Sequence, residues 1–101
     1  MGVPTYKIVL LIDDSKIDNL IHTRVIQLAS LAEKILAKES PVDALQYLKD
    51  NSTNPDNLPD IIFLDINMPE MTGFQFLEEY DKLPAQVTSK AKVIMLSSSL
   101  D

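Results

Sequence analysis

Four short apolar segments alternate with longer amphipathic segments along this chain. Residues 7–12 and 60–65 are apolar at nearly every inner position, which is typical of parallel strands covered by helices on both faces. Residues 33–39 carry lysines near both ends, and such charges suit an edge strand because they discourage pairing with another chain. Residues 92–96 form a fourth apolar run. The pattern therefore predicts four strands.

Two of the amphipathic segments predict helices in the first half of the chain. From Lys16 onward, apolar residues recur at spacings of four, four and three positions, namely at Ile17, Ile21, Val25 and Leu28. This is the period of a helix, and it predicts one of about 14 residues. Ser40 is placed to act as the N-cap of a second helix over residues 41–50. Pro41 would take its first helical position and Asp43 the capping-box position.

A third helix is predicted over residues 74–82, because Thr72 and Gln75 form another capping-box pattern. Strands and helices thus alternate through 101 residues, which predicts a single α/β domain with a parallel sheet and right-handed crossovers. In such open sheets, ligands bind beyond the carboxyl ends of the strands, where the strand order reverses. For the flavodoxin-like order 2-1-3-4, that point lies between the strands at 7–12 and 60–65.

Acidic side chains follow the two strands that meet at this point. Asp13 and Asp14 end the first, Asp65 ends the second, and Ser97 follows the neighbouring strand. An acid after a strand is often only an N-cap or a solvated loop residue. Three carboxylates at one rim are different, because two charges 4–5 Å apart repel by roughly 3–4 kcal/mol at an effective dielectric constant of 20. Mg²⁺ offsets such repulsion, since it binds carboxylate, water and phosphate oxygens.

The amino-acid composition excludes several kinds of functional site. The chain has no cysteine, which excludes disulfides, thiolate metal sites and cysteine nucleophiles. Its only glycines are Gly2 and Gly73, so glycine-rich phosphate loops are absent. The single histidine, His22, is interpreted as a surface residue of the first predicted helix. What remains is a carboxylate nucleophile beside a metal, as in aspartyl-phosphate formation, with Ser97 as a hydroxyl donor to the phosphoryl group.

The net charge and the hydropathy of the chain indicate which partners it can bind and where in the cell we expect it. The net charge of −6 disfavours binding to nucleic acids or anionic membranes. The longest purely aliphatic run covers residues 8–12, far fewer than the ~20 residues that span a bilayer. Residues 1–5 have neither the basic region nor the apolar stretch of a signal peptide. We therefore expect a cytoplasmic protein that binds neither nucleic acid nor membranes.

Three segments resemble the receiver domain of two-component response regulators: residues 8–15, 60–74 and 93–99. The middle segment carries the most specific motif, in which Asp65 ends a strand and a loop follows with Asn67, Met68, Pro69, Thr72 and Gly73. The resemblance covers essentially the whole chain, residues 1–101, in the expected order. It implies a single receiver domain with a CheY-like, flavodoxin-like sheet.

The resemblance implies a role for each acid. Asp65 resembles the phosphoacceptor, and Asp14 the direct Mg²⁺ ligand of the acidic pair. Asp13 would bind the metal mainly through water, and the backbone carbonyl of Asn67 would be the third protein ligand. The cofactor implied is therefore Mg²⁺, held by Asp13, Asp14, Asp65 and Asn67.

Other positions of the motifs match residues that surround the phosphoryl group. Ser97 resembles the switch hydroxyl, and Ser98 the small neighbour that leaves the phosphoryl group room. Pro69 and Gly73 are interpreted as residues that shape the loop.

The resemblance also implies a C-terminal helix-strand-helix portion, whose strand ends in a lysine that pairs with the acyl phosphate. This sequence stops at Asp101, and Lys90 and Lys92 lie too early to replace that lysine. We expect a receiver that is shortened at its C-terminus. The strand at 92–96 would then be an exposed aliphatic edge that supports self-association.

The function that the resemblance implies is a signalling switch and not an enzyme with its own substrate. A sensor histidine kinase or phosphotransfer protein would supply the phosphoryl group to Asp65, and the chain would catalyse at most its own phosphorylation and dephosphorylation. The alternative is a phosphate-independent binding module, or a fragment without a working site. A flavin-binding or hydrolytic α/β enzyme is disfavoured. Asp13 and Asp14 would repel phosphate without a metal, and Asn67 stands where a haloacid-dehalogenase-type phosphatase carries a second aspartate.

Overall fold

A single parallel sheet organises the molecule. The computed structural model describes residues 5–66 and 68–96. Their four strands are hydrogen-bonded in the order β2-β1-β3-β4, with β1 at Tyr6–Ile12, β2 at Ala32–Lys38, β3 at Ile61–Asp65 and β4 at Lys92–Leu96. All three strand pairs are parallel. The predicted α/β class and the order 2-1-3-4 are confirmed.

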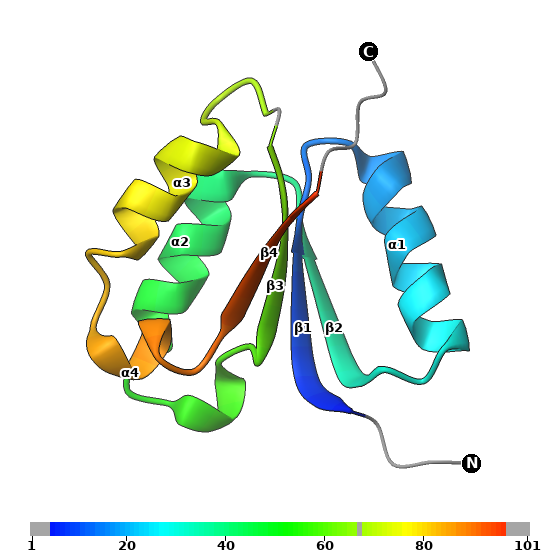
Figure 1. The fold of residues 1–101 in the computed structure, drawn as a ribbon, viewed down its shortest axis with the longest axis horizontal. Helices are drawn as coiled ribbons and strands as arrows, with labels where there is room; N and C mark the ends of the chain where they lie inside the picture. Colours follow the sequence, from blue (N-terminus) through cyan, green and yellow to red (C-terminus); the bar gives the residue numbers. More distant parts are fainter. Residues whose placement is uncertain (1–4, 67, 97–101) are drawn as a thin grey trace.

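The longer helices cover both faces of this sheet. Helix α1 (Lys16–Leu28) lies on one face, and α2 (Pro41–Asp50) and α3 (Gly73–Tyr80) lie on the other (Figure 1). Two short helical turns, η1 (Pro55–Asn57) and α4 (Ala85–Thr88), lie in segments for which the sequence pattern predicts neither a helix nor a strand. Within residues 5–66 and 68–96, none of the helices has the length and apolar character needed to cross a membrane.

Successive residues of β1 and β3 point to opposite faces and build two cores. Beneath α2 and α3, the larger core includes Leu10, Ile12, Ile62, Leu64, Leu48 and Phe76. The smaller core beneath α1 is built from Val9, Leu11, Ile61 and Ile26. Because both faces of the central strands are buried, residues 8–12 of β1 and 61–64 of β3 are apolar at consecutive rather than alternate positions.

Side-chain caps fix where the helices begin. The hydroxyl of Ser40 accepts a hydrogen bond from the backbone N–H of Asp43 at 3.3 Å. Thr72 and Gln75 exchange bonds of 3.1 and 2.9 Å, so the predicted capping box of α3 is confirmed. The hydroxyl of Ser15 accepts from the N–H of Asp18 at 3.2 Å. Each such cap satisfies a backbone donor that the helix itself leaves unpaired.

The apolar stripe of α1 does not face the sheet. Its four side chains are all more than half exposed, namely Ile17, Ile21, Val25 and Leu28. The residues of α1 that are buried against the strands are Asn19 and Ile26, which lie on a different side of the helix at 3.6 residues per turn. The period therefore predicted the helix correctly, but not which side packs on β1 and β2.

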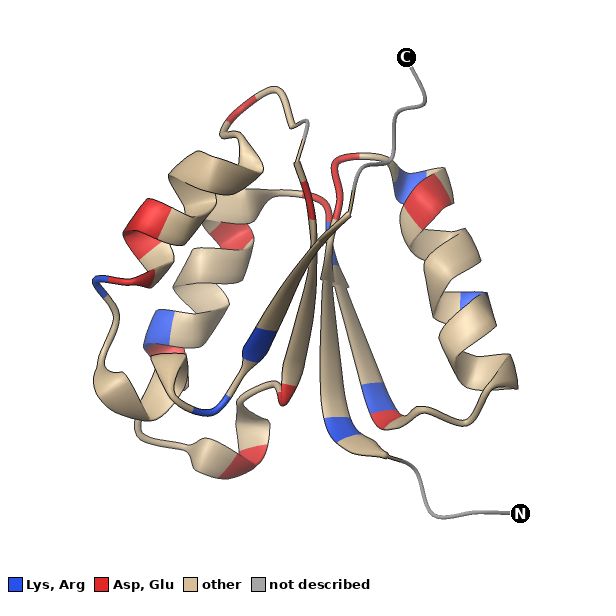
Figure 2. Cartoon of the chain, in the orientation of Figure 1, with Lys and Arg blue, Asp and Glu red and all other residues tan. Residues whose placement is uncertain are grey.

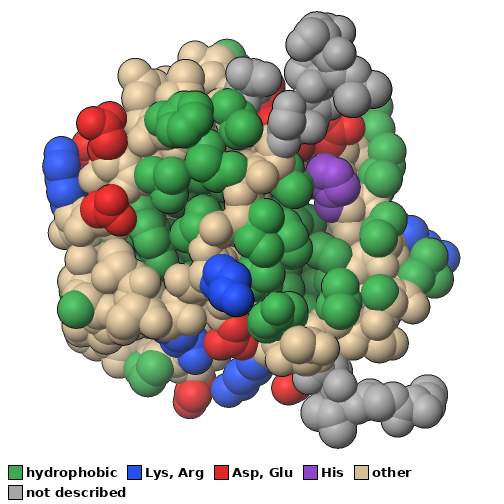
Figure 3. Space-filling model, in the orientation of Figure 1, with side chains coloured by type: hydrophobic (Ala, Val, Ile, Leu, Met, Phe, Trp, Pro, Cys, Tyr) green, Lys and Arg blue, Asp and Glu red, His purple; other side chains and the backbone are tan. Residues whose placement is uncertain are grey.

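An open apolar hollow lies between α1 and the sheet. It has a volume of about 260 Å³, and Leu11, Ile26, Leu31 and Phe63 are among its lining residues. Figure 3 shows hydrophobic side chains gathered over this part of the surface. His22 also lines the hollow and is partly exposed, which agrees with its interpretation as a surface residue of the helix.

At the amino ends of the strands, Asp60 ties three of them together. Its Oδ2 accepts hydrogen bonds from the backbone N–H groups of Lys7 at 2.7 Å and Ile8 at 3.3 Å. Its Oδ1 lies 3.3 Å from Nζ of Lys90, just before β4. Burial alone would raise the pKa of Asp60, but these backbone hydrogen bonds and the Lys90 ammonium together hold it below its ordinary value.

Candidate metal centre

The carboxyl ends of β1 and β3 bring three acids together. Register pairs Ile12 with Leu64, so the residues that follow them, Asp13 and Asp65, meet at the same edge of the sheet. Carboxylate oxygens of Asp13, Asp14 and Asp65 all lie within 4.8 Å of one another. Figure 2 shows the acidic residues at this end of the central strands. The predicted convergence of these three acids is confirmed.

Two of the three carboxylates are buried. Asp13 is 4% exposed and Asp65 2%, whereas Asp14 is exposed. Buried carboxylates are rare unless a cation or hydrogen-bond donors compensate their charge. The set offers only hard oxygen ligands, with one member open to solvent, and this suits Mg²⁺, which keeps several waters when it binds protein. The residues present therefore fit the metal that the sequence implied.

Asn19 holds Asp13 in place. Its amide nitrogen donates to the carbonyl of Asp13 at 2.9 Å and to that of Lys38 at 3.2 Å. The N–H of Ser15 donates to Oδ1 of Asp13 at 2.9 Å. Asn19 is 4% exposed, so it joins the ends of β1 and β2 to the first turn of α1 from inside the protein. No sequence pattern indicates this role, because Asn19 is one of several polar residues on an amphipathic helix.

The environment of Asp13 disfavours its charge. Burial raises the pKa of Asp13 above its ordinary value, the hydrogen bond from Ser15 opposes that shift, and the charges of Asp65, Asp18 and Asp14 add to it. A folded-state pKa above that of the unfolded chain means that the native protein binds its proton more tightly. Ionisation of Asp13 therefore lowers stability as the pH rises from 3.8, its ordinary value, through the raised one.

Replacing Asp13 with Asn is expected to stabilise the metal-free protein at neutral pH. The amide keeps an oxygen that accepts from Ser15 but removes a buried charge and its repulsion, which is worth about 1 kcal/mol in bulk water and roughly 3–4 kcal/mol at an effective dielectric constant of 20. Denaturant unfolding of the wild type and of Asp13→Asn at pH 7 and at about pH 3 measures the effect, which should vanish at the lower pH. Glu33→Gln, an exposed acid of β2, is the charge-matched control. A gain that persists unchanged at acid pH would contradict an electrostatic cause.

The loop after Asp65 returns the chain closely to the sheet. The N–H of Gly73 donates to the carbonyl of Ile66 at 2.9 Å, and Met68 is buried in the larger core. A Cβ added at Gly73 would lie 2.8 Å from Cε of Met95 and 3.1 Å from the carbonyl oxygen of Asp65. Gly73 thus permits a close approach between loop and strands, which supports its structural interpretation.

Some predicted site residues are not among those described. Asn67, Ser97 and Ser98 lie outside residues 5–66 and 68–96, so their predicted roles stay predictions. The three aspartates are the part of the predicted site that the structure brings together.

Comparison with known proteins identifies the family. The family model of the response regulator receiver domain matches residues 9–101. The chain belongs to this family. The predicted resemblance is thereby confirmed, and the acidic cluster lies in a receiver domain of two-component signalling.

Individual relatives agree with the receiver assignment. The sensor histidine kinase CheAY of Helicobacter pylori is 37% identical over 79 residues, which is 78% of this chain but only 9% of the kinase. A two-component response regulator from Cytophaga hutchinsonii superposes with a TM-score of 0.86 at 33% identity, over 96% of this chain and 72% of that one.

A more distant receiver shares the fold. It is the receiver domain of the histidine kinase CKI1 from Arabidopsis thaliana, whose crystal structure contains Mg²⁺ and BeF₃⁻. It superposes with a TM-score of 0.76 at 24% identity, over 94% of this chain and 68% of that one.

Proposed function

We propose that this receiver domain is a phosphorylation-dependent signalling switch in which Asp65 accepts a phosphoryl group with the help of Mg²⁺. The observation that carries the proposal is the cluster of three carboxylates within 4.8 Å, two of them buried, at the edge of the sheet where α/β folds bind ligands. The CKI1 receiver, which has the same fold, was crystallised with Mg²⁺ and BeF₃⁻, and this supports the choice of metal.

The transfer step uses the side chain of Asp65 as nucleophile. One carboxylate oxygen of Asp65 forms a bond to phosphorus, and the bond between phosphorus and an imidazole nitrogen of the donor breaks, leaving the electron pair on that nitrogen. Asp13 and Asp14 would hold Mg²⁺, with Asn67 contributing its backbone carbonyl. The metal, when bound, neutralises charge on the carboxylate and phosphoryl oxygens. Ser97 would donate its hydroxyl to the transferred group.

The donor is proposed to be a sensor histidine kinase or a phosphotransfer protein, as the similarity to a sensor histidine kinase suggests. In this role the chain has no substrate to turn over and catalyses at most its own phosphorylation and dephosphorylation. We place this function in the cytoplasm, without direct binding to nucleic acid. Self-association through β4 is a further proposal. β4 is an edge of the described sheet and has one lysine, Lys92, whereas the opposite edge, β2, has two near its centre and end, Lys34 and Lys38.

A thermal melt with Mg²⁺ and beryllofluoride, a stable mimic of the aspartyl phosphoryl group, tests the proposal. Ligand at about 100 times its dissociation constant adds ~2.7 kcal/mol, which raises the Tm of a domain of this size by roughly 11–20 °C. Mg²⁺ alone and fluoride without beryllium are the controls. A cooperative transition whose Tm is the same with and without Mg²⁺ and beryllofluoride would contradict the proposal and favour a phosphate-independent binding module. Absence of a transition would favour a fragment without a working site.

A further inference from the structure

A second concave surface lies between α2 and α3, on the face of the sheet opposite α1. It is a groove of about 450 Å³ whose lining comes from α2, from the loop before α3 and from α3 itself. Its α2 residues run from Val42 to Lys49, a length of about 10 Å at 1.5 Å per residue. The groove therefore has room for about two turns of a helix or three to four extended residues.

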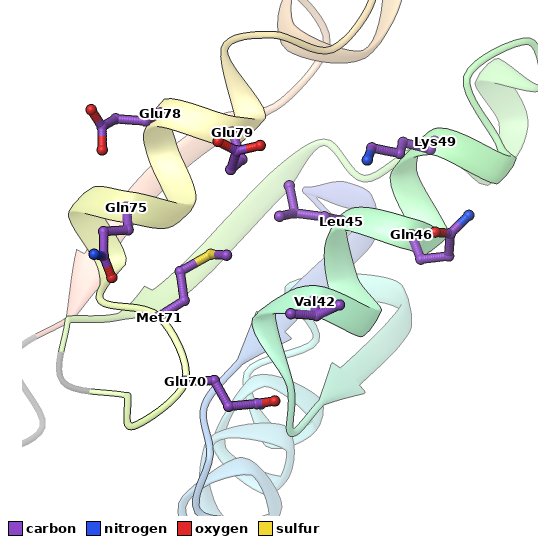
Figure 4. Close-up of a pocket in the computed structure, with 9 residues that line it drawn as sticks. All are labelled: Val42, Leu45, Gln46, Lys49, Glu70, Met71, Gln75, Glu78 and Glu79. Atoms are coloured by element: carbon purple, nitrogen blue, oxygen red, sulfur yellow. The ribbon is translucent and has the colours of Figure 1, made fainter.

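The floor of the groove is apolar. Leu45 of α2 is buried, Met71 of the loop is partly buried, and both point into the space between the helices (Figure 4). Val42 lies at one end and is 51% exposed. An apolar side chain of a ligand can thus be removed from water here, which is worth about 25 cal/mol per Å² of apolar area.

The rim of the groove is acidic. Three glutamates line it, Glu70, Glu78 and Glu79, against the single cation of Lys49. Glu79 forms an ion pair of 3.0 Å with Lys82. Within the part of the chain that the structure describes, neither Glu70 nor Glu78 takes part in an ion pair. Two carboxylates on different elements therefore flank an apolar floor without an ion pair, although the charge of Glu78 also acts on Lys82.

We propose that this groove binds a basic amphipathic segment of a partner protein, with one or two apolar side chains on Leu45 and Met71 and Lys or Arg side chains on Glu70 and Glu78. Charge complementarity selects this occupant. The same carboxylates repel phosphate groups, so neither nucleic acid nor an anionic membrane fits the rim. None of Asp13, Asp14 and Asp65 lines this groove, so the proposal does not rest on phosphorylation of Asp65.

Titration of the whole ¹⁵N-labelled chain with a synthetic helical peptide tests the proposal. The peptide is a 14-mer with leucines at i and i+4 and lysines on the flanking positions; a second peptide has glutamate in place of each lysine. We expect amide shifts confined to α2, the loop before α3 and α3 with the lysine peptide, weaker at high salt, and none with the glutamate peptide.

Variants of exposed residues distinguish the groove from general attraction to an acidic protein. Glu70→Gln with Glu78→Gln should weaken binding about fivefold, and Val42→Ser should weaken it without a charge change. Glu33→Gln on β2 with Glu39→Gln just after it, both exposed acids, make the same charge change elsewhere and should have little effect. Equal weakening by both pairs, shifts that map to α1 and the apolar hollow beside it, or no binding at all would each overturn the proposal.

Discussion

The variant Asp65→Asn is expected to lose labelling by acetyl phosphate in the presence of Mg²⁺, by about a thousandfold or more. The amide oxygen that replaces the carboxylate carries no full negative charge and is a poor nucleophile. The substitution keeps the shape of a side chain that is 2% exposed. It also removes one charge from a cluster of three, so the fold should be retained. Intact-protein mass spectrometry measures the labelled fraction over time, and denaturant unfolding checks that the variant is folded.

A matched control is available beside the cluster. Asp18 lies in the first turn of α1, close enough for its charge to act on Asp13, but it is not one of the three clustered acids. Asp18→Asn should therefore be labelled at a rate close to that of the wild type. If the Asp65 variant is labelled as fast as the wild type, Asp65 is not the phosphoacceptor and the proposed function fails at its central step.

The largest effect on stability is expected from Phe76→Ala. Phe76 is fully buried in the larger core and stacks on Tyr80 with ring centroids 6.0 Å apart. Truncating a buried phenylalanine to alanine loses its transfer free energy and leaves a cavity, at a cost of about 3–5 kcal/mol. That is a large part of the 5–15 kcal/mol that stabilises a typical domain. Urea unfolding measures the change in the free energy of unfolding.

Phe74 provides the comparison for that experiment, because it lies on the same helix and is 63% exposed. Phe74→Ala removes the same atoms from a site already in contact with water and should change stability by no more than about 0.5 kcal/mol. Equal losses from the two substitutions would mean that α3 does not pack on the sheet through Phe76.

Much of the fold followed from local patterns in the sequence. Aliphatic runs over β1 and β3 are long because both faces of central strands are buried, and the alternation of elements admits few topologies. The acids were predictable for the same reason, since residues that end adjacent parallel strands must meet. Thr72 and Gln75 fixed the start of α3 because a capping box is a local interaction.

Other features depend on tertiary contacts that sequence patterns do not encode. Apolar periodicity predicted α1, but its side toward the sheet is set by Asn19 and Ile26, and the apolar stripe remains in contact with water. Asn19 acts through backbone carbonyls that come from two strands, so no local pattern reveals it. The turn at α4 (Ala85–Thr88) is only four residues long, too short for a periodic signal. The acidic groove brings Glu70 close to α2, although the two are far apart in the sequence, so no local pattern predicts it.

The ties made by Asp60 imply that the two ends of the sheet respond to acid in opposite ways. The pKa of Asp60 is lowered in the folded protein, so its contribution to stability is present above its ordinary value of 3.8 and is lost as the pH falls through the lowered one. Protonation of Asp13, whose pKa is raised, relieves repulsion over the neighbouring range. Acidification therefore weakens the contacts that hold the amino ends of β1, β3 and β4 together. At the carboxyl ends of β1 and β3 it instead reduces the repulsion between carboxylates. Acid unfolding should accordingly begin at the amino ends of the strands, the end of the sheet farthest from the metal centre, where the Asp60 carboxylate joins three strands.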